Sequence, residues 1–287
     1  MGRQLNVRSV LLRYGLKPKK TWSQNFLVDE DVLGDIAEAV GWGEVQTVVE
    51  LGAGIGALSA LLAGNARRVI AVERDRDLAA LLRSEFANDP VVEVLEANAA
   101  TLDYKEISVR LGEKPAVVGN LPYHMATQIL FHLLASADDL SHWILMFQKE
   151  LADRLLAAPG SRAYGVVSVL VGQRTDVEQV RRVEPQAFYP RPRVRSSVLR
   201  FQPRAALRAP VRDWGLFEQV VKGAFGQRRK KVKNALASSF KTRLKSDELD
   251  RVLSAAGIDG GLRAEQLSIE DFSRLADVFW SYLGKDQ

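Results

Sequence analysis

Short apolar runs that alternate with helical patterns constrain the fold of this chain most strongly. Five runs fit strands, namely TVVEL (47–51), RVIAVE (68–73), VVEVLE (91–96), AVVGN (116–120) and HWILMFQ (142–148). Helical or loop sequence follows each run, and a first helix is predicted over residues 29–41. Strands that are apolar along their whole length and are separated by helices are typical of a parallel sheet covered on both faces. We therefore predict an α/β domain with a doubly wound, mostly parallel sheet.

The strand pattern continues to about residue 203 and is then replaced by a helical one. TDVEQVRRV (175–183) and SSVLRFQP follow each other without a convincing helix between them, so we expect an antiparallel pair at one edge of the sheet. Residues 202–210 contain two prolines and are the predicted linker. The expected parts are a basic N-terminal segment (1–28), an α/β domain (29–203) and a small all-helical domain (204–287).

The composition is that of an ordinary globular protein and excludes several kinds of site. The 287 residues are 47% hydrophobic and 26% charged, and no apolar run approaches the length that spans a membrane. The N-terminus lacks the long apolar stretch of a secretory signal. The chain has no cysteine and only three histidines, so neither disulfides nor a metal centre is expected. We expect a cytoplasmic monomer without metal and without a membrane partner.

Charge is segregated along the chain, whose net charge is +5. Residues 1–28 contain six basic residues and no acidic one, and residues 204–245 contain twelve basic residues against two acidic ones. The stretch after residue 245 carries nine acidic and four basic residues. Such segregation favours a polyanionic partner, and nucleic acid more than a membrane, because no strongly apolar face accompanies the charge. A solvated basic surface is the alternative interpretation.

A glycine-rich turn joins the first of the five strands to the next helix. VVELGAGIG (48–56) ends a strand on Glu50, and glycines follow at positions 52, 54 and 56. Glycines allow backbone to approach a ligand closely, and a helix N-terminus offers free N–H groups. Glu73 ends the next strand about 20 residues later, where an acid binds ribose hydroxyls in this architecture. The spacing differs from the G-x-G-x-x-G of dinucleotide binders, so S-adenosylmethionine fits better than NAD; tight packing alone is the alternative.

The stretch VVGNLPYHMATQIL (117–130) ends a buried strand on an asparagine and enters a helix through Leu-Pro-Tyr. A turn needs only the proline and the asparagine. An amide, a rigid kink and an aromatic ring together also suit the binding of a flat polar group. A strand-ending turn with a buried tyrosine is the alternative interpretation of these four residues.

Eight motifs occur in order from about Lys19 to Asp277. They are KKTWSQNFLVD, VVELGAGIGALS, VVGNLPYHMAT, MFQKELADRL, SRAYGVVSVL, AFYPRPRVRSSVLRF, AFGQRRKKVKNAL and LRAEQLSIEDFSRLA. Each motif alone is weakly specific, but eight in this order are highly specific. With them the chain resembles the ribosomal RNA adenine dimethyltransferases of the kasugamycin-resistance type.

The resemblance implies both a fold and an activity. The fold is a Rossmann-like class I methyltransferase domain with a mostly parallel seven-stranded sheet, plus a small C-terminal helical domain. The activity is transfer of methyl groups from S-adenosylmethionine to two adjacent adenines near the 3′ end of 16S rRNA, two methyls on each. The partner is then 16S rRNA or a precursor of the small ribosomal subunit.

The resemblance also implies which residues line the cofactor pocket. They are Asn25, Leu27, Gly52, Gly54, Glu73, Asn98 and Asn120. The family has an aspartate after the fourth strand that bonds the cofactor adenine, and LEANAATL places Asn98 at that position. A neutral acceptor in place of a charged one loses roughly 1 kcal/mol, so we expect weaker cofactor binding than in relatives with aspartate.

Catalysis on adenine requires acceptors for the hydrogens of its exocyclic amine, whose lone pair is delocalised into the ring. Two acceptors favour the pyramidal form that attacks a sulfonium methyl. We expect the side-chain oxygen of Asn120 and the main-chain carbonyl of Pro122 to be these acceptors, with Tyr123 stacked on the base. The amine is inaccessible in a duplex, so the adenine must be flipped out or unpaired. The expected catalytic residues are Asn120, Leu121, Pro122, Tyr123 and, as a second wall for the base, Phe188; an ordinary core role is the alternative for Phe188.

Two basic runs are the expected contacts to rRNA phosphates. GQRRKKVKN (226–234) lies at a predicted helix end, and RPRVR (191–195) adds charge near the predicted pocket. The residues are Arg191, Arg193, Arg228, Arg229, Lys230, Lys231 and Lys233. A solvated face is the alternative for such runs.

Two other functions remain open from the sequence. One is a large-subunit rRNA adenine methyltransferase, which GQRRKKVKN and RAEQLSIEDFSRLA disfavour. The other is a ribosome-assembly or transcription-associated RNA-binding protein with a weakened cofactor site, which only Asn98 favours. Binding of S-adenosylmethionine distinguishes the second alternative from the enzyme.

Overall fold

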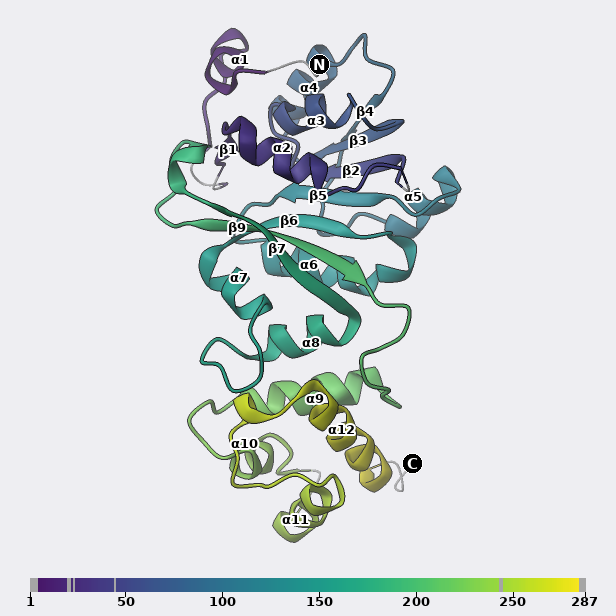
Figure 1. The fold of residues 1–287 in the computed structure, drawn as a ribbon, viewed down its shortest axis with the longest axis vertical. Coiled ribbons are helices and arrows are strands. Elements are labelled where there is room, and N and C mark those ends of the chain that lie inside the picture. The colour runs from purple at the N-terminus through teal and green to yellow at the C-terminus, as the bar shows by residue number, and fades with distance from the viewer. Residues whose placement is uncertain (1–4, 20–21, 23, 44, 243–244, 284–287) are drawn as a thin grey trace. The chain divides into compact units, whose positions relative to one another are not determined.

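Seven strands form the central sheet of the computed structural model, which describes residues 5–19, 22, 24–43, 45–242 and 245–283 (Figure 1). The strands are β2 (Thr47–Leu51), β3 (Arg68–Glu73), β4 (Val92–Glu96), β5 (Ala116–Asn120), β6 (Trp143–Gln148), β7 (Thr175–Val183) and β9 (Ser196–Pro203). Their order is β4-β3-β2-β5-β6-β9-β7. Neighbouring strands from β4 to β6 in this order are parallel, and β9 is antiparallel to β6. This confirms the predicted seven-stranded, mostly parallel sheet, with β9 and β7 at one edge.

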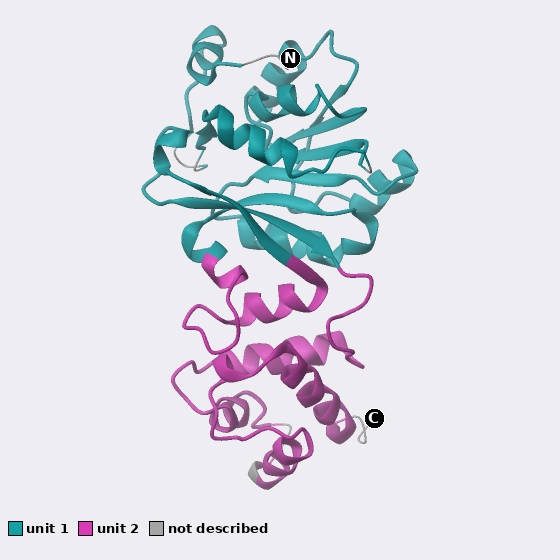
Figure 2. Ribbon diagram, viewed as in Figure 1, with its two compact units in different colours: residues 1–152, 177–203 teal, residues 153–176, 204–287 magenta. Residues whose placement is uncertain are grey.

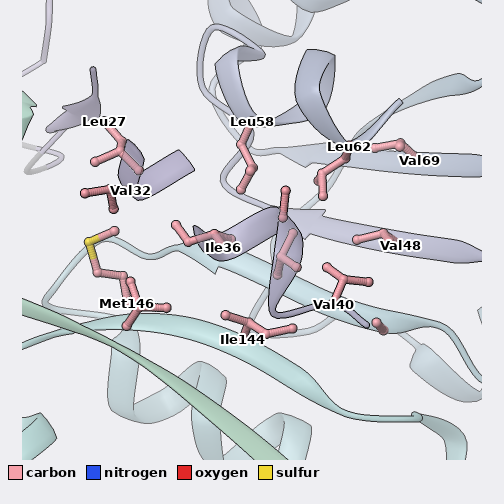
Figure 3. Close-up of a cluster of buried hydrophobic side chains, with 14 of the residues drawn as sticks. Leu27, Val32, Ile36, Val40, Val48, Leu58, Leu62, Val69, Ile144 and Met146 are labelled. Carbon is pink, nitrogen blue, oxygen red and sulfur yellow. The ribbon is translucent and has the colours of Figure 1, made fainter. Parts of the chain in front are cut away.

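Helices cover both faces of the sheet, and seven α-helices lie within residues 7–155 of the described chain. They are α1 (Val7–Arg13), α2 (Glu30–Glu38), α3 (Ala57–Leu62), α4 (Arg76–Glu85), α5 (Tyr104–Leu111), α6 (Ala126–Ala135) and α7 (Lys149–Leu155). Figure 3 shows α2 and α3 directing Ile36 and Leu58 onto the strands that carry Val48 and Ile144. Val49, which alternates with Val48 and faces the other side, is equally buried, as expected for a parallel sheet covered on both faces.

Acidic side chains fix where two of these helices begin. Asp29 accepts a hydrogen bond from the Val32 N–H at 3.1 Å and caps α2, and Asp75 accepts from the Asp77 N–H and caps α4. The helix predicted over residues 29–41 is therefore present with its predicted cap. The cap at Asp75 places α4 directly after β3, so that Glu73 lies beside a helix N-terminus.

The order of the strands reverses beside β2. The chain runs outward from β2 through β3 to β4, and then returns to the other side of β2 with β5. Ligands of open α/β sheets bind at such a switch point, beyond the carboxyl ends of the strands. The sheet therefore places its ligand-binding edge at the ends of β2, β3 and β5.

A two-stranded ribbon brings the N-terminal segment to the same region. Strand β1 (Phe26–Leu27) pairs antiparallel with β8 (Phe188–Tyr189), with Leu27 opposite Phe188. Helix α1 buries Val7, Val10 and Leu11 in a cluster with Phe26, and Arg13 pairs with the buried Glu85 at 2.7 Å. Arg3 and Lys20, and with them part of the motif KKTWSQNFLVD, lie outside the described residues.

The chain divides into two compact units, and each is described by itself (Figure 2). Unit 1 contains residues 1–152 and 177–203, and unit 2 contains residues 153–176 and 204–287. The predicted N-terminal segment lies within the bounds of unit 1. No helix among the described residues is long and apolar enough to cross a membrane.

Unit 2 differs from the predicted helical domain by including residues 153–176. Its helices are α8 (Val166–Arg174), α9 (Trp214–Phe225), α10 (Val232–Ser239), α11 (Ser246–Ala255) and α12 (Ile269–Leu283). The fully buried Gln173 of α8 explains the difference, because its Nε2 donates to the Ala209 carbonyl at 2.6 Å and to Ser273 Oγ at 3.1 Å. These hydrogen bonds join residues up to 100 positions apart, and no local sequence pattern reports them.

Candidate active site

A pocket of about 220 Å³ lies in unit 1 at the carboxyl ends of β2, β3 and β5. All seven residues predicted to bind a cofactor line it, from Asn25 in the N-terminal segment to Asn120 at the end of β5. Leu121, Pro122 and Tyr123 line the same pocket. The sheet topology thus gathers side chains that are up to about 100 residues apart in the sequence.

Glu73 is the central acid of this pocket. The side chain is 8% exposed; its Oε2 accepts from the Gly54 N–H at 2.9 Å and its Oε1 accepts from the Asp75 N–H at 2.8 Å. Burial raises the pKa of Glu73, and the backbone N–H donors act against that rise. Each carboxylate oxygen can accept a further hydrogen bond, so Glu73 still has the capacity to bind a diol.

The glycine turn between β2 and α3 is backbone that few other residues can adopt. Gly54 has a φ of +60°, and a Cβ there would lie 3.1 Å from the Phe26 ring. Gly56 has a φ of +84°, and a Cβ there would lie 2.5 Å from the Phe86 ring. Gly56 serves packing against Phe86. Gly54 keeps the pocket wall thin, and its N–H reaches Glu73.

Glu50 is a pocket residue for which the sequence predicted no role. It is 3% exposed, and Ser59 Oγ donates a short hydrogen bond to its Oε2. Burial raises the pKa of Glu50 to about 8, a rise that the Ser59 hydrogen bond opposes and that the nearby Glu73 carboxylate increases. The sequence shows Glu50 near the end of a strand, two residues before Gly52. The other residues of that strand do not indicate which way the Glu50 side chain points, so its place in the pocket could not be predicted.

Asn98 lies on the pocket wall after β4. Its Oδ1 accepts from the Ala100 N–H at 3.1 Å, and its carbonyl accepts from the Thr101 N–H at 3.0 Å. These bonds fix the side chain in a local turn with the oxygen engaged by one donor. An amide oxygen has two lone pairs, so one remains for a ligand.

Asn120 and Tyr123 are held in place by other elements. Asn120 Nδ2 donates to the Asn25 carbonyl at 3.0 Å, which assigns the amide orientation and leaves Oδ1 as the acceptor. The Tyr123 hydroxyl lies 2.9 Å from Ser196 Oγ of β9, with the ring half-buried. The Pro122 carbonyl accepts from the Met125 N–H at 2.9 Å, so one of its lone pairs is already used within the turn.

Phe188 does not line this pocket, and its role as a second wall for the base stays a prediction. Its ring is 4% exposed and belongs to the hydrophobic cluster that includes Leu27 and Ala187. It lines a separate hollow together with Arg8 and Tyr189. Phe188 lies in β8, directly opposite Leu27 of β1.

The predicted RNA-binding residues lie on exposed segments of both units. Arg191 and Arg193 are exposed in the loop between β8 and β9, and residues 228–231 are exposed between α9 and α10. Lys233 is half-buried and pairs with Asp250 at 2.6 Å, while Arg228 donates to the Arg162 carbonyl. Lys233 is therefore already neutralised by an ion pair within unit 2.

Three further pocket residues were not singled out from the sequence. Trp22 and Gln24 precede Asn25, and Arg74 follows Glu73. The Arg74 guanidinium lies 4.6 Å from the centre of the Trp22 ring, a cation–π contact. Their adjacency to predicted residues was the available signal. Among the described residues, no cluster of histidine, aspartate or glutamate side chains is suited to a metal ion.

The chemistry of the pocket residues fits the nucleoside cofactor expected from the sequence. Glu73 offers carboxylate oxygens, Asn98 offers an amide oxygen, and the turn at Gly54 allows a ligand to approach the backbone closely. The buried carboxyl group of Glu50 adds a second acceptor in the same pocket.

Comparison with known proteins shows similarity to one family of rRNA methyltransferases. The family model "Ribosomal RNA adenine dimethylase" matches residues 15–280. A protein of Anaeromyxobacter sp. (strain K) named "Ribosomal RNA small subunit methyltransferase A" is 44% identical, over 93% of this chain and 95% of that protein. The protein of the same name from Myxococcus xanthus is 42% identical, over 93% of each chain.

Two solved structures are similar in fold. The 23S rRNA methyltransferase ErmE has a TM-score of 0.66 and 26% identity, covering 88% of this chain and 98% of that chain. A dimethyladenosine transferase from Plasmodium falciparum has a TM-score of 0.75 and 21% identity, covering 90% and 98%. The first confirms a relation to rRNA methyltransferases, and the second shows the shared fold. The chain belongs to the ribosomal RNA adenine dimethylase family of S-adenosylmethionine-dependent rRNA methyltransferases.

Proposed function

We propose that this enzyme dimethylates two adjacent adenines near the 3′ end of 16S rRNA during assembly of the small ribosomal subunit. It acts in the cytoplasm, as a monomer, on 16S rRNA or a small-subunit precursor. The fixed amide of Asn120 beside a nucleoside-binding pocket is the observation that carries the proposal. When bound, S-adenosylmethionine supplies a methyl group on a positively charged sulfur.

The amide of Asn120 binds and orients the amine of the target adenine. Because Nδ2 donates to the Asn25 carbonyl, Oδ1 is the atom that accepts a hydrogen of the amine. The second lone pair of the Pro122 carbonyl accepts the other hydrogen. Two such bonds favour the pyramidal amine, and alignment supplies most of the rate enhancement. No strong base is needed before the attack, since the amine loses its proton only after it has become cationic.

Tyr123 stacks on the base once the adenine has left its helix. The Ser196 contact holds the ring, so little side-chain freedom is lost on binding. Base–aromatic stacking contributes about 1–3 kcal/mol. The adenine is flipped out or unpaired when it enters, because its amine is inaccessible in a duplex.

The cofactor is held by residues of the pocket. Glu73 binds the ribose hydroxyls, Asn98 accepts from the adenine amino group, and Asn25, Leu27, Gly52 and Gly54 line the remainder. The exposed cations Arg191, Arg193 and those of residues 228–231 contact rRNA phosphates, with unit 2 as the main RNA-binding part.

The relatives favour the small ribosomal subunit as the source of the substrate. Proteins named for the small subunit are 42–44% identical over more than nine-tenths of the chain, whereas the 23S rRNA methyltransferase ErmE is 26% identical. The presence of Glu73 in the pocket and the hydrogen bond from Asn120 Nδ2 to the Asn25 carbonyl oppose a purely RNA-binding role with a decayed cofactor site.

The test is to locate the methylated bases. The protein is incubated with S-adenosylmethionine and unmethylated small subunits, free 16S rRNA or free 23S rRNA, and the RNA is digested for mass spectrometry. We expect dimethyladenosine at two adjacent positions near the 3′ end of 16S rRNA and none in 23S rRNA. Methylation confined to 23S rRNA, or none in any substrate, contradicts the proposal.

A further inference from the structure

A strap from the N-terminal segment, defined here as residues 19, 22 and 24–27, is bonded to the turn between β3 and α4. Lys19 Nζ lies 2.7 Å from Asp75 Oδ1 and 2.8 Å from Asp77 Oδ2. Gln24 Nε2 donates to Asp75 Oδ2 at 2.8 Å, and the Lys19 N–H donates to Gln24 Oε1 at 2.8 Å. Both carboxylate oxygens of Asp75 are thus occupied by donors from the strap.

Asp75 is an unusual partner for a surface ion pair, because its side chain is only 2% exposed. Burial acts to raise its pKa, but the hydrogen bonds from Lys19 and Gln24 hold the pKa below its ordinary value. Removing the partner of a buried charge is costly, since the carboxylate would remain desolvated without compensation. The position of the strap and the charge of Asp75 therefore depend on each other.

The strap connects the two halves of the active site. On one side the Asp75 N–H donates to Oε1 of Glu73, the acid proposed to bind ribose. On the other side the Asn25 carbonyl, one residue after Gln24, accepts from Nδ2 of Asn120. A continuous series of contacts thus leads from the cofactor acid to the amide that receives the adenine.

A second contact holds the strap in the same place. The Trp22 ring contacts two cations, with the Arg74 guanidinium 4.6 Å and Lys19 Nζ 5.5 Å from its centre. Arg74 follows Glu73 directly and also contacts Met125 Sδ at 3.6 Å. The turn around Glu73 therefore contacts the strap through a salt bridge, an amide and a ring.

We propose that Lys19, Gln24 and Asp75 are positioning residues of methyl transfer, which hold the strap so that the Asn25 carbonyl fixes the orientation of the Asn120 amide. The role of Asn120 rests on the proposed function. Without the Lys19–Asp75 pair, the strap shifts, the Asn120 amide rotates, and its oxygen no longer meets the amine. Misplacement of a reacting group by about 1 Å can lower a rate by about a hundredfold.

The test compares Lys19→Met, which removes the charge and keeps an unbranched chain, with Lys19→Arg, which restores it. Arg110→Met is the matched control, because Arg110 forms a similar pair with Glu93 at 2.9 Å and does not line the pocket. Single-turnover methyl transfer is measured at saturating RNA and cofactor, and cofactor Kd is measured by equilibrium dialysis. We expect Lys19→Met to lower the rate about tenfold while the Kd changes less than about threefold, with Lys19→Arg and Arg110→Met close to wild type.

Three results overturn the inference: an unchanged saturated rate in Lys19→Met, a loss that Lys19→Arg does not restore, or an equal loss in Arg110→Met. Hydrogen exchange in the free protein provides a readout independent of the reaction. The Val28 N–H donates to the Ala187 carbonyl at 2.8 Å beside the strap, so Lys19→Met should speed exchange over residues 26–28 and Arg110→Met should not. If the wild-type protein methylates no rRNA, the proposed function fails, and hydrogen exchange alone then tests whether Lys19 holds the strap. Unchanged exchange over residues 26–28 in Lys19→Met contradicts a role of Lys19 in holding the strap.

Discussion

Glu50 and Glu73 place two buried carboxyl groups in one pocket, and the two groups accept hydrogen bonds from different kinds of donor. Glu73 accepts from two backbone N–H groups, whereas Glu50 accepts from the side-chain hydroxyl of Ser59. The pKa is raised for both by burial, and for Glu50 it reaches about 8. Glu50 is therefore protonated at neutral pH in the absence of a ligand, and the pocket then carries less negative charge than its sequence implies.

This protonation has a consequence for stability. The folded protein retains the Glu50 proton at pH values where the unfolded chain, with an ordinary pKa of 4.5, has lost it. The contribution of Glu50 to the free energy of unfolding therefore falls as pH rises from about 4.5 to about 8. Glu50→Gln, which keeps the shape and cannot ionise, should be more stable than wild type by about 1–3 kcal/mol at pH 8 and by much less at pH 5. Urea unfolding of both proteins at the two pH values measures the difference, and an advantage for the variant that is equal at pH 5 and pH 8 contradicts the assignment.

Asn98 provides a prediction about the cofactor. Asn98→Asp keeps the hydrogen bond to the Ala100 N–H and adds charge to the atom proposed to accept from the cofactor adenine. We expect S-adenosylmethionine to bind several-fold more tightly, an effect of up to about 1 kcal/mol, and Asn98→Ala to bind it more weakly. Isothermal titration with the three proteins tests this. If neither substitution changes the Kd, Asn98 is not a cofactor ligand.

At the scale of elements, the sequence predicted strands more reliably than it predicted contacts between distant segments. Strands β2, β3 and β5 have the predicted bounds, because a β-branched run buried on both faces has few other structures available. The ribbon of β1 with β8 is only two residues long on each side and has no such pattern. This ribbon, which the sequence did not predict, places Phe188 opposite Leu27.

The segment between α9 and α10 gives the element-scale prediction. Arg228, Arg229, Lys230 and Lys231 are exposed, so their charges are available to phosphates. Replacing all four by glutamine should weaken rRNA binding and reduce the dependence of the binding constant on salt by about one unit of slope per lost phosphate contact. Filter binding at several salt concentrations measures both quantities. Neutralising Lys222 and Arg251, which form ion pairs within their own helices, is the control and should have little effect. A salt slope that stays the same in the fourfold variant identifies the run as a solvated face.

At the scale of the whole molecule, the sequence predicted one α/β part and one helical part, and the structure divides the chain differently at residues 153–176. Helix α8 is apolar on several sides. From the sequence alone, such a helix cannot be distinguished from a buried element of an α/β domain. Its assignment depends on buried Gln173, whose partners come from a linker and from α12. The sequence motifs contain the predicted residues that line the pocket. Their joint placement depends on the strand order, which brings Glu73 and Asn120 to one edge of the sheet, and on the segment before β1, which adds Asn25.

The central claim is that the oxygen of Asn120 receives the amine of the target adenine. Asn120→Ala removes this acceptor and leaves Glu73, Asn98 and the glycine turn in place. The most direct measurement is single-turnover methyl transfer to unmethylated small subunits, together with the Kd of S-adenosylmethionine for the same protein. We predict a rate lower by about a hundredfold, the range expected when one oriented polar group is lost from an active site, and a Kd within about threefold of wild type. A wild-type rate in Asn120→Ala would contradict the account.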